Sequence, residues 1–140
     1  MIKYYVGDIR RDPDTVFVFG SNTQGRHGAG AAKIAHDVFG AVYGQARGIQ
    51  GQSYAIVTKD LRGGYRSIPE CRIVAQIQEL YEYARRHPEL NFKVAYRNVA
   101  ERSLNGYSGY EMIFMFKSAG EIPDNVWISE EWYNTGLFNT

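Results

Sequence analysis

The chain has 140 residues, of which 44% are hydrophobic and 22% charged, a balance that excludes an intrinsically disordered protein. Its 16 basic and 15 acidic residues give a net charge of +1, so no overall attraction to nucleic acid or to an anionic membrane is expected. The single cysteine, Cys71, excludes an internal disulfide and a cysteine-based zinc site.

Length and the absence of targeting signals place the chain among ordinary globular proteins. We expect one domain, residues 1–140, with a core of its own. The opening MIKYYVGDIRR lacks the long apolar core of a signal peptide, and no stretch reaches membrane-spanning length. We therefore expect a cytoplasmic protein that has no membrane partner.

The first half of the chain predicts three strands and one helix. Residues 2–6 read as a strand, followed by the turn-forming GDIRRDPD. The continuously apolar run 16–19 predicts a second strand, buried on both faces. A helix is predicted at 31–39, stopped near Gly40, and a third strand at 54–57.

The second half continues the alternation. Ser67-Ile-Pro-Glu70 predicts a capping box that opens a helix ending at His87-Pro88. This helix places five apolar side chains on one face: Ile73, Ile77, Leu80, Tyr81 and Ala84. After a strand at 92–96 and a loop at 97–110, a helix is predicted at 111–119 and a late strand at 126–128. The alternation predicts an α/β fold, a three-layer α/β/α sandwich around a mixed central sheet, with ligands at the strands' carboxyl ends.

A glycine-rich loop joins the second strand to the first helix in the segment 16–32, VFVFGSNTQGRHGAGAA. Backbone N–H groups at the positive end of a helix suit an anion, most often a phosphate. Turn glycines also occur in such units without a ligand. Here the polar residues Asn22, Arg26 and His27 among the glycines favour a ligand site.

Several familiar sites are disfavoured by spacing. Gly28-Ala-Gly30-Ala-Ala-Lys33 departs from the dinucleotide fingerprint GxGxxG, because Lys33 replaces the third glycine and no acid follows about 20 residues later. The sequence has no P-loop and no nucleophile elbow. Its three histidines, at 27, 36 and 87, are too far apart to indicate a metal site. We expect no metal and no organic cofactor.

A second glycine loop, LNGYSGY, occupies residues 104–110, with Tyr107 and Ser108 between its glycines. As a backbone cradle it would wrap a phosphate opposite the first loop; as a plain tyrosine-rich turn it would bind nothing. Two cradles in one small domain suggest a diphosphate ligand, with aromatic rings flanking a sugar or base.

Over roughly residues 2–120 the chain resembles macrodomains, the ADP-ribose-binding modules. The resemblance rests on residues in the order and spacing of that family: Gly7-Asp8-Ile9, Asn22, Gly28, Gly30 and His36. The segment 51–60, GQSYAIVTKD, is similar to the family's middle strand, and 106–110 resembles its second phosphate loop.

The resemblance implies a binding role for each of these positions. Asp8 would accept a hydrogen bond from the adenine amino group, with the backbone of Ile9 beside it; a turn or capping role for Asp8 stays open. Asn22 would meet the hydroxyls of the distal ribose. Backbone N–H groups would hold the two phosphates, those of Gly28, Ala29 and Gly30 one, and those of Gly106, Tyr107, Ser108 and Gly109 the other. Tyr107 or Tyr110 would line the distal ribose or the adenine.

Hydrolytic macrodomains use acidic and basic residues that this chain lacks. Ala32 stands where one branch has an aspartate, and His36 and Asn105 align with the lysine and aspartate of another. An enzyme built on this chain would hydrolyse an ADP-ribose linkage or ADP-ribose 1″-phosphate with water as nucleophile. His36 or His27 would then be the base, and Asn105 would orient a water or hydroxyl. His36 also fits an ordinary histidine of an amphipathic helix.

Three functions follow from these patterns. The first is binding of ADP-ribose or an ADP-ribosyl group, with or without hydrolysis. The second is a non-catalytic module that reads ADP-ribosylated targets or sequesters a free NAD-derived nucleotide, which Ala32 and Asn105 favour. The third is a nucleic-acid-associated protein, against which the near-neutral charge argues; its phosphate-facing residues would be Arg26, Lys33, Arg62, Arg66 and Arg72. The expected partner is ADP-ribose or an ADP-ribosylated macromolecule, without strong direct binding to nucleic acid.

Overall fold

The computed structural model describes residues 2–64 and 66–139, and within them six strands form one sheet. The strands are β1 (Lys3–Tyr5), β2 (Thr15–Asn22), β3 (Gly48–Gln50), β4 (Ser53–Lys59), β5 (Asn91–Val94) and β6 (Val126–Ser129). They lie in the order β1-β6-β5-β2-β4-β3, and every neighbouring pair is parallel except β3 with β4. The expectation of a mixed central sheet is confirmed.

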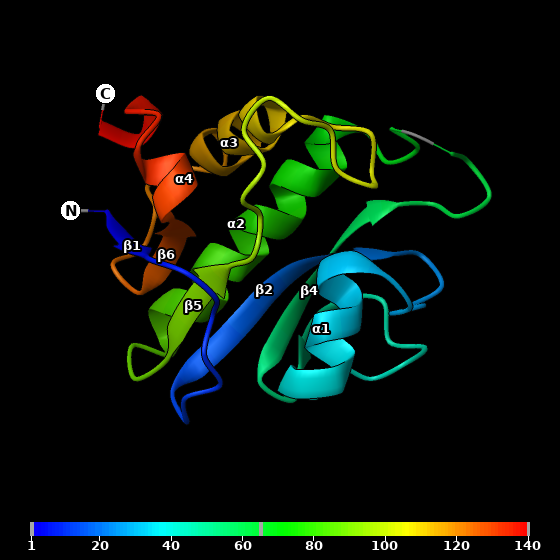
Figure 1. Ribbon diagram of the computed structural model, residues 1–140, viewed down its shortest axis with the longest axis horizontal. Helices are drawn as coiled ribbons and strands as arrows, with labels where there is room; N and C mark the ends of the chain where they lie inside the picture. Colours follow the sequence, from blue (N-terminus) through cyan, green and yellow to red (C-terminus); the bar gives the residue numbers. More distant parts are fainter. Residues whose placement is uncertain (1, 65, 140) are drawn as a thin grey trace.

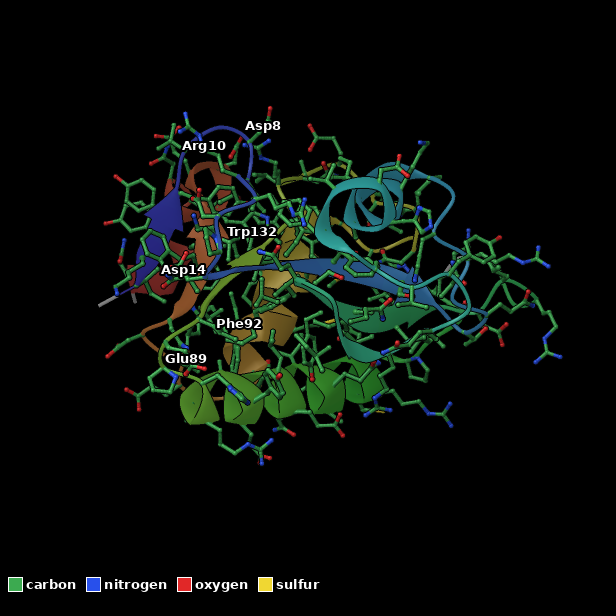
Figure 2. The ribbon with its side chains drawn as sticks, turned by 90° about the horizontal axis from the view of Figure 1, so that it is seen from below. Asp8, Arg10, Asp14, Glu89, Phe92 and Trp132 are labelled. Atoms are coloured by element: carbon green, nitrogen blue, oxygen red, sulfur yellow. The ribbon has the colours of Figure 1, made fainter. Side chains whose placement is uncertain are left out.

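Helices cover both faces of this sheet. They are α1 (Gly30–Phe39), α2 (Glu70–Arg86), α3 (Gly109–Ser118) and the single turn α4 (Glu130–Tyr133), followed by the 3-10 turn η1 (Leu137–Asn139). Figure 2 shows α1 on one side of the sheet and α2 on the other, and α3 lies beside α2 (Figure 1). The fold is the three-layer α/β/α sandwich that the alternating elements predict. In the described part of the chain, no helix is long and apolar enough to cross a membrane.

Strand β2 lies near the middle of the sheet, and its apolar side chains are buried on both faces. Val16 and Val18 pack in the cluster that includes α2 and α3, whereas Phe17 and Phe19 pack in the cluster on the α1 side. Successive side chains of a strand point to opposite faces, so a continuous apolar run suits a strand covered on both sides. The prediction for this strand is confirmed.

The long helix α2 has the predicted buried face but not the predicted start. All five of its predicted apolar residues are buried. The helix begins at Glu70 with Pro69 as its N-cap, and no side chain caps it. Ser67 instead binds Asp60: its hydroxyl accepts from the Asp60 N–H at 2.7 Å and donates to the Asp60 carbonyl. The predicted capping box is therefore wrong, because the loop between β4 and α2 uses that hydroxyl.

The sequence analysis did not predict strand β3 or helix α4. A three-residue strand has too few side chains to show alternation. Its position depends instead on a close backbone approach: a Cβ on Gly51, just after β3, would lie 2.7 Å from the Gly40 carbonyl oxygen at the end of α1. Backbone packing between the end of α1 and the turn after β3 thus places this edge of the sheet.

Candidate functional site

The two glycine loops meet at the carboxyl end of the sheet. The first, 28–30, lies between β2 and α1, and the second, 104–110, leads into α3. A Cβ built on Gly30 would lie 3.4 Å from Cδ1 of Leu104, whose side chain is 62% exposed. The sequence prediction that both loops lie where the parallel strands end agrees with this geometry, and the loops are neighbours in space.

The first loop leaves its backbone donors open. Gly28, Ala29 and Gly30 are all exposed. No residue described by the structure accepts a hydrogen bond from any of their three N–H groups. Helix α1 also begins without a side-chain cap and without an acidic residue in its first turn. Its positive end is therefore electrostatically uncompensated, which favours an anion there.

Asn22 shapes this loop from within. Its side-chain oxygen accepts the N–H groups of Gln24 and Arg26 at 3.2 and 3.0 Å, and its Nδ2 donates to the Arg26 carbonyl at 2.8 Å. The amide thus closes the turn that carries the chain from β2 toward Gly28. A ribose contact by Asn22, expected from the resemblance, would have to share an amide that already holds the backbone.

His27 lies beneath the loop rather than on it. The residue is 2% exposed, and its ring meets Phe19 edge-on. Its Nε2 lies 3.1 Å from the Gln45 carbonyl and 3.2 Å from Oε1 of Gln50. A carbonyl only accepts, so Nε2 carries a proton and donates. The buried Nδ1 has no partner among the described residues. The imidazole therefore connects the loop to β3 and to the segment before it.

The second loop is closed by its own hydrogen bonds. Each backbone N–H from 106 to 110 has an acceptor at 2.8–3.2 Å: respectively the Ser103 carbonyl, Asn105 Oδ1, Glu111 Oε1, the Glu101 carbonyl and the Val99 carbonyl. Ser108 and Glu111 form a complete capping box on α3. The Ser108 N–H, together with Arg66, holds the pKa of the Glu111 carboxyl below its usual range. A phosphate on these N–H groups would have to displace an existing bond.

The side chains of this loop are mostly turned inward. Tyr107 is buried and donates its hydroxyl to the Ile68 carbonyl at 2.7 Å. Asn105 is 3% exposed, and its amide contacts the Tyr107 N–H and the Ser103 hydroxyl. Gly109 has no room for a side chain, because a Cβ would lie 1.7 Å from the Asn98 carbonyl oxygen. Tyr110 is 44% exposed, so it is the better candidate of the two tyrosines for ligand contact.

His36 and Asn105 share no hydrogen bond in the part of the chain that the structure describes. His36 is on the exposed face of α1, where its Nδ1 is 3.1 Å from Asp37 and its ring meets Tyr43 edge-on. Hydrogen bonds from Lys33 and then His36 lower the pKa of Asp37. None of the contacts of Asn105 involves this helix. The two residues aligned with a catalytic pair are not brought together.

Asp8 and Ile9 follow β1, which forms the edge of the sheet opposite β3. Ile9 packs against the apolar cluster under α1, and Asp8 lies at the surface on the same side of the sheet as α1 (Figure 2). The Asp8 carboxylate is fully exposed, and Oδ1 is 3.3 Å from Nη1 of Arg97. No backbone acceptor for the Ile9 N–H occurs in the described chain.

Sequence reasoning missed two residues that follow β5, Tyr96 and Arg97. The Tyr96 hydroxyl lies against Gly20 of β2, where a Cβ would be 2.2 Å away, and it hydrogen-bonds Thr58 and Asn105. Burial raises the pKa of Tyr96 to about 12. The available signal was Gly20 itself, since a glycine inside an apolar strand often marks a close approach by another group.

No group of three or more His, Cys, Asp or Glu side chains is placed to hold a metal ion within residues 2–64 and 66–139. The features that favour an anion here are backbone N–H groups and the positive end of α1.

Comparison with known proteins gives one informative result. No family model and no curated protein sequence matches the chain. Among solved structures, it is similar to the macrodomain of Mycobacterium tuberculosis DarG, with a TM-score of 0.55 and 18% identity. The match covers 92% of this chain and 97% of that one. At this identity the likeness shows the fold alone: the chain has a macrodomain fold.

Proposed function

We propose that the protein binds ADP-ribose, free or attached to a macromolecule, at the carboxyl end of its sheet. The macrodomain fold supports this proposal at the level of architecture. The observation that carries it is the first loop, where three N–H groups that have no acceptor among the described residues meet the uncapped positive end of α1. A phosphate supplies the acceptors and the negative charge that this loop lacks.

The remaining parts of the ligand follow from that anchor. With one phosphate on Gly28–Gly30, the adenine would lie toward Asp8 and Ile9, whose carboxylate and N–H offer an acceptor beside a donor. The second loop would form a wall through Leu104 and Tyr110, because its own N–H groups are already bonded. The sequence analysis expected both loops to bind phosphate through backbone N–H groups. We now propose this role for the first loop only.

The geometry favours binding over rapid hydrolysis. His27 is buried and bonded to Gln45 and Gln50, and His36 is paired with Asp37 away from Asn105. A non-catalytic module that reads ADP-ribosylated targets or sequesters a nucleotide is therefore preferred to a hydrolase. If hydrolysis occurs, we expect it to be slow, since loss of a general base costs about 10²–10⁴-fold in rate.

Isothermal titration with ADP-ribose, AMP and NAD tests the binding proposal, using Gly28→Val as the diagnostic variant. Gly28 has no positive φ, and a Cβ there would meet nothing within 4 Å, so the variant should fold. Its branched side chain would cover the N–H groups and weaken ADP-ribose binding by tenfold or more, the cost of a lost charged hydrogen bond. Equal affinity in a variant with parental thermal stability would remove the first loop from the site.

Turnover assays separate the binding module from the enzyme. Protein-linked, nucleic-acid-linked and 1″-phosphorylated ADP-ribose should be bound with little or no release of product. Should product appear, His36→Ala and His27→Ala are compared for turnover and for ADP-ribose affinity. Fast turnover by the parent would contradict the preference for a binding module, and its survival in both variants would exclude both imidazoles as the base.

A further inference from the structure

Arg97 joins three separate segments at the edge of the proposed site. Its Nη2 donates to the Gly7 carbonyl, and its Nη1 lies 3.3 Å from Oδ1 of Asp8. Its Nε lies 3.8 Å from Oε2 of Glu131 in α4. The guanidinium thus connects the end of β5 to the loop after β1 and to α4.

We propose that Arg97 is a positioning residue that gives the site its preference for adenine, by holding Asp8 and the backbone before it in one arrangement. The inference rests on the proposed function, because it assigns Asp8 and Ile9 to the base of the bound nucleotide.

The loop that carries Asp8 needs such a support. Gly7 has a φ of +75°, a conformation open to glycine, and a Cβ there would meet nothing within 4 Å, so no neighbouring group packs on this side of Gly7. The Asp8 side chain is fully exposed and would otherwise rotate freely. By bonding both the Gly7 carbonyl and Asp8 Oδ1, Arg97 fixes the backbone and the carboxylate together.

The Arg97 side chain is itself supported by the ring of Tyr5 in β1. Its guanidinium carbon lies 5.8 Å from the centre of the Tyr5 ring. The Tyr5 hydroxyl donates to the Val94 carbonyl at 2.5 Å, and burial raises the pKa of this phenol, so it stays a donor. A planar, forked cation stacked on a fixed ring can serve a carbonyl and a carboxylate at once, which the single ammonium of lysine does less well.

The held arrangement matches one base edge. With Oδ1 engaged by Arg97, the other Asp8 oxygen and the Ile9 N–H have no partner in the described chain. An acceptor beside a donor complements adenine, whose amino group donates and whose N1 accepts. Hypoxanthine presents a carbonyl and an N1–H in those places, so both contacts would be mismatched. Polar sites of this kind discriminate strongly, because a mismatch leaves groups unpaired.

The test compares ADP-ribose with its hypoxanthine counterpart, inosine diphosphate ribose, by isothermal titration. The parent should prefer ADP-ribose by tenfold or more. Arg97→Met keeps the packing on Tyr5 but removes the fork, so ADP-ribose affinity should fall about tenfold while the hypoxanthine ligand changes less than about twofold. Arg97→Lys should retain part of the preference. A uniform loss for both ligands would show a merely structural role and overturn the inference.

Two controls complete the experiment. Arg85→Met is the matched variant, since Arg85 lies 6.0 Å over Tyr81 and donates to the Glu121 carbonyl on another part of the surface. It should leave both affinities unchanged. In an Asp8→Ala background, Arg97→Met should have no further effect on base preference, and an additive effect would contradict action through Asp8. If the parent binds neither ligand, the proposed function fails with the inference; equal parental affinity for both ligands overturns the inference alone.

Discussion

The two glycine loops look alike in sequence and differ in their free donors. At 28–30 the residues are exposed and their three backbone N–H groups have no acceptor among the described residues, whereas at 106–110 five N–H groups all have one. The acceptors of the second loop are supplied by residues on either side of it, among them Glu101 and Glu111. Glycine content therefore does not by itself indicate an anion site; the availability of competing acceptors decides.

The helices that follow the loops show the same contrast. α3 begins with a capping box, and the Glu111 carboxylate compensates its positive end. The N-cap of α1 is Ala29, whose methyl group cannot accept a hydrogen bond, and the first turn of this helix holds no acid. An uncapped helix start costs about 1 kcal/mol of stability relative to a capped one. In this protein the uncapped start is the feature on which the proposed phosphate site depends.

The largest expected effect is a loss of folding stability when the tightly packed Gly109, rather than the open Gly28, is replaced by alanine. Gly109→Ala would place a Cβ 1.7 Å from the Asn98 carbonyl oxygen, an atom of the backbone that cannot move aside cheaply. Alanine gains up to about 1 kcal/mol in helix propensity, but the clash should outweigh it and destabilise the fold by about 3 kcal/mol or more. Denaturant unfolding measures this. Gly28→Ala is the control and should stay within about 0.5 kcal/mol of the parent; equal stabilities would contradict the comparison.

A smaller change in folding stability is expected when α1 is given a capping side chain like the one that α3 already has. Ala29→Asp places a carboxylate at the N-cap of α1, where the backbone is already extended. The new cap should accept the N–H of Ala31 or Ala32 and stabilise the protein by about 0.5–1 kcal/mol. Its negative charge beside the N–H groups of residues 28–30 should repel phosphate and weaken ADP-ribose binding tenfold or more. Ala29→Asn caps without charge and should weaken binding less. Unchanged ADP-ribose affinity in Ala29→Asp would place the phosphate elsewhere.

The smallest expected effect is a change with pH in the stability that Glu111 contributes to the second loop. The Ser108 N–H lowers the pKa of Glu111 in the folded protein from its ordinary 4.5. A lowered folded-state pKa gives stability that is fully present above about pH 4.5 and is lost as the pH falls through the folded value. The stability difference between the parent and Glu111→Gln should therefore shrink on acidification below pH 4.5. A difference that is constant from pH 7 to pH 3 would show that the charge contributes nothing.

Local pattern was sufficient for the main elements. The apolar run 16–19 and the helical spacing in α2 each predict a buried surface that the structure contains. The motif at Ser67 wrongly predicted a capping box, because the Ser67 hydroxyl binds the Asp60 backbone across a loop instead of capping the helix. Periodicity reports which side of an element is apolar, but it does not report which acceptor a polar group finds.

The sequence alone determined the layers, the position of the glycine loops at the strand ends and the resemblance to macrodomains. These follow from hydrophobic period and from glycine spacing, which are properties of neighbouring residues. Three features depend on contacts made in the folded chain: the burial of His27 beneath its loop, the contact of Arg97 with Asp8, and the closed second loop. The physical reason is that a donor is free or engaged according to which acceptors lie within about 3 Å in the fold, and those partners come from segments as distant as β1 and β5.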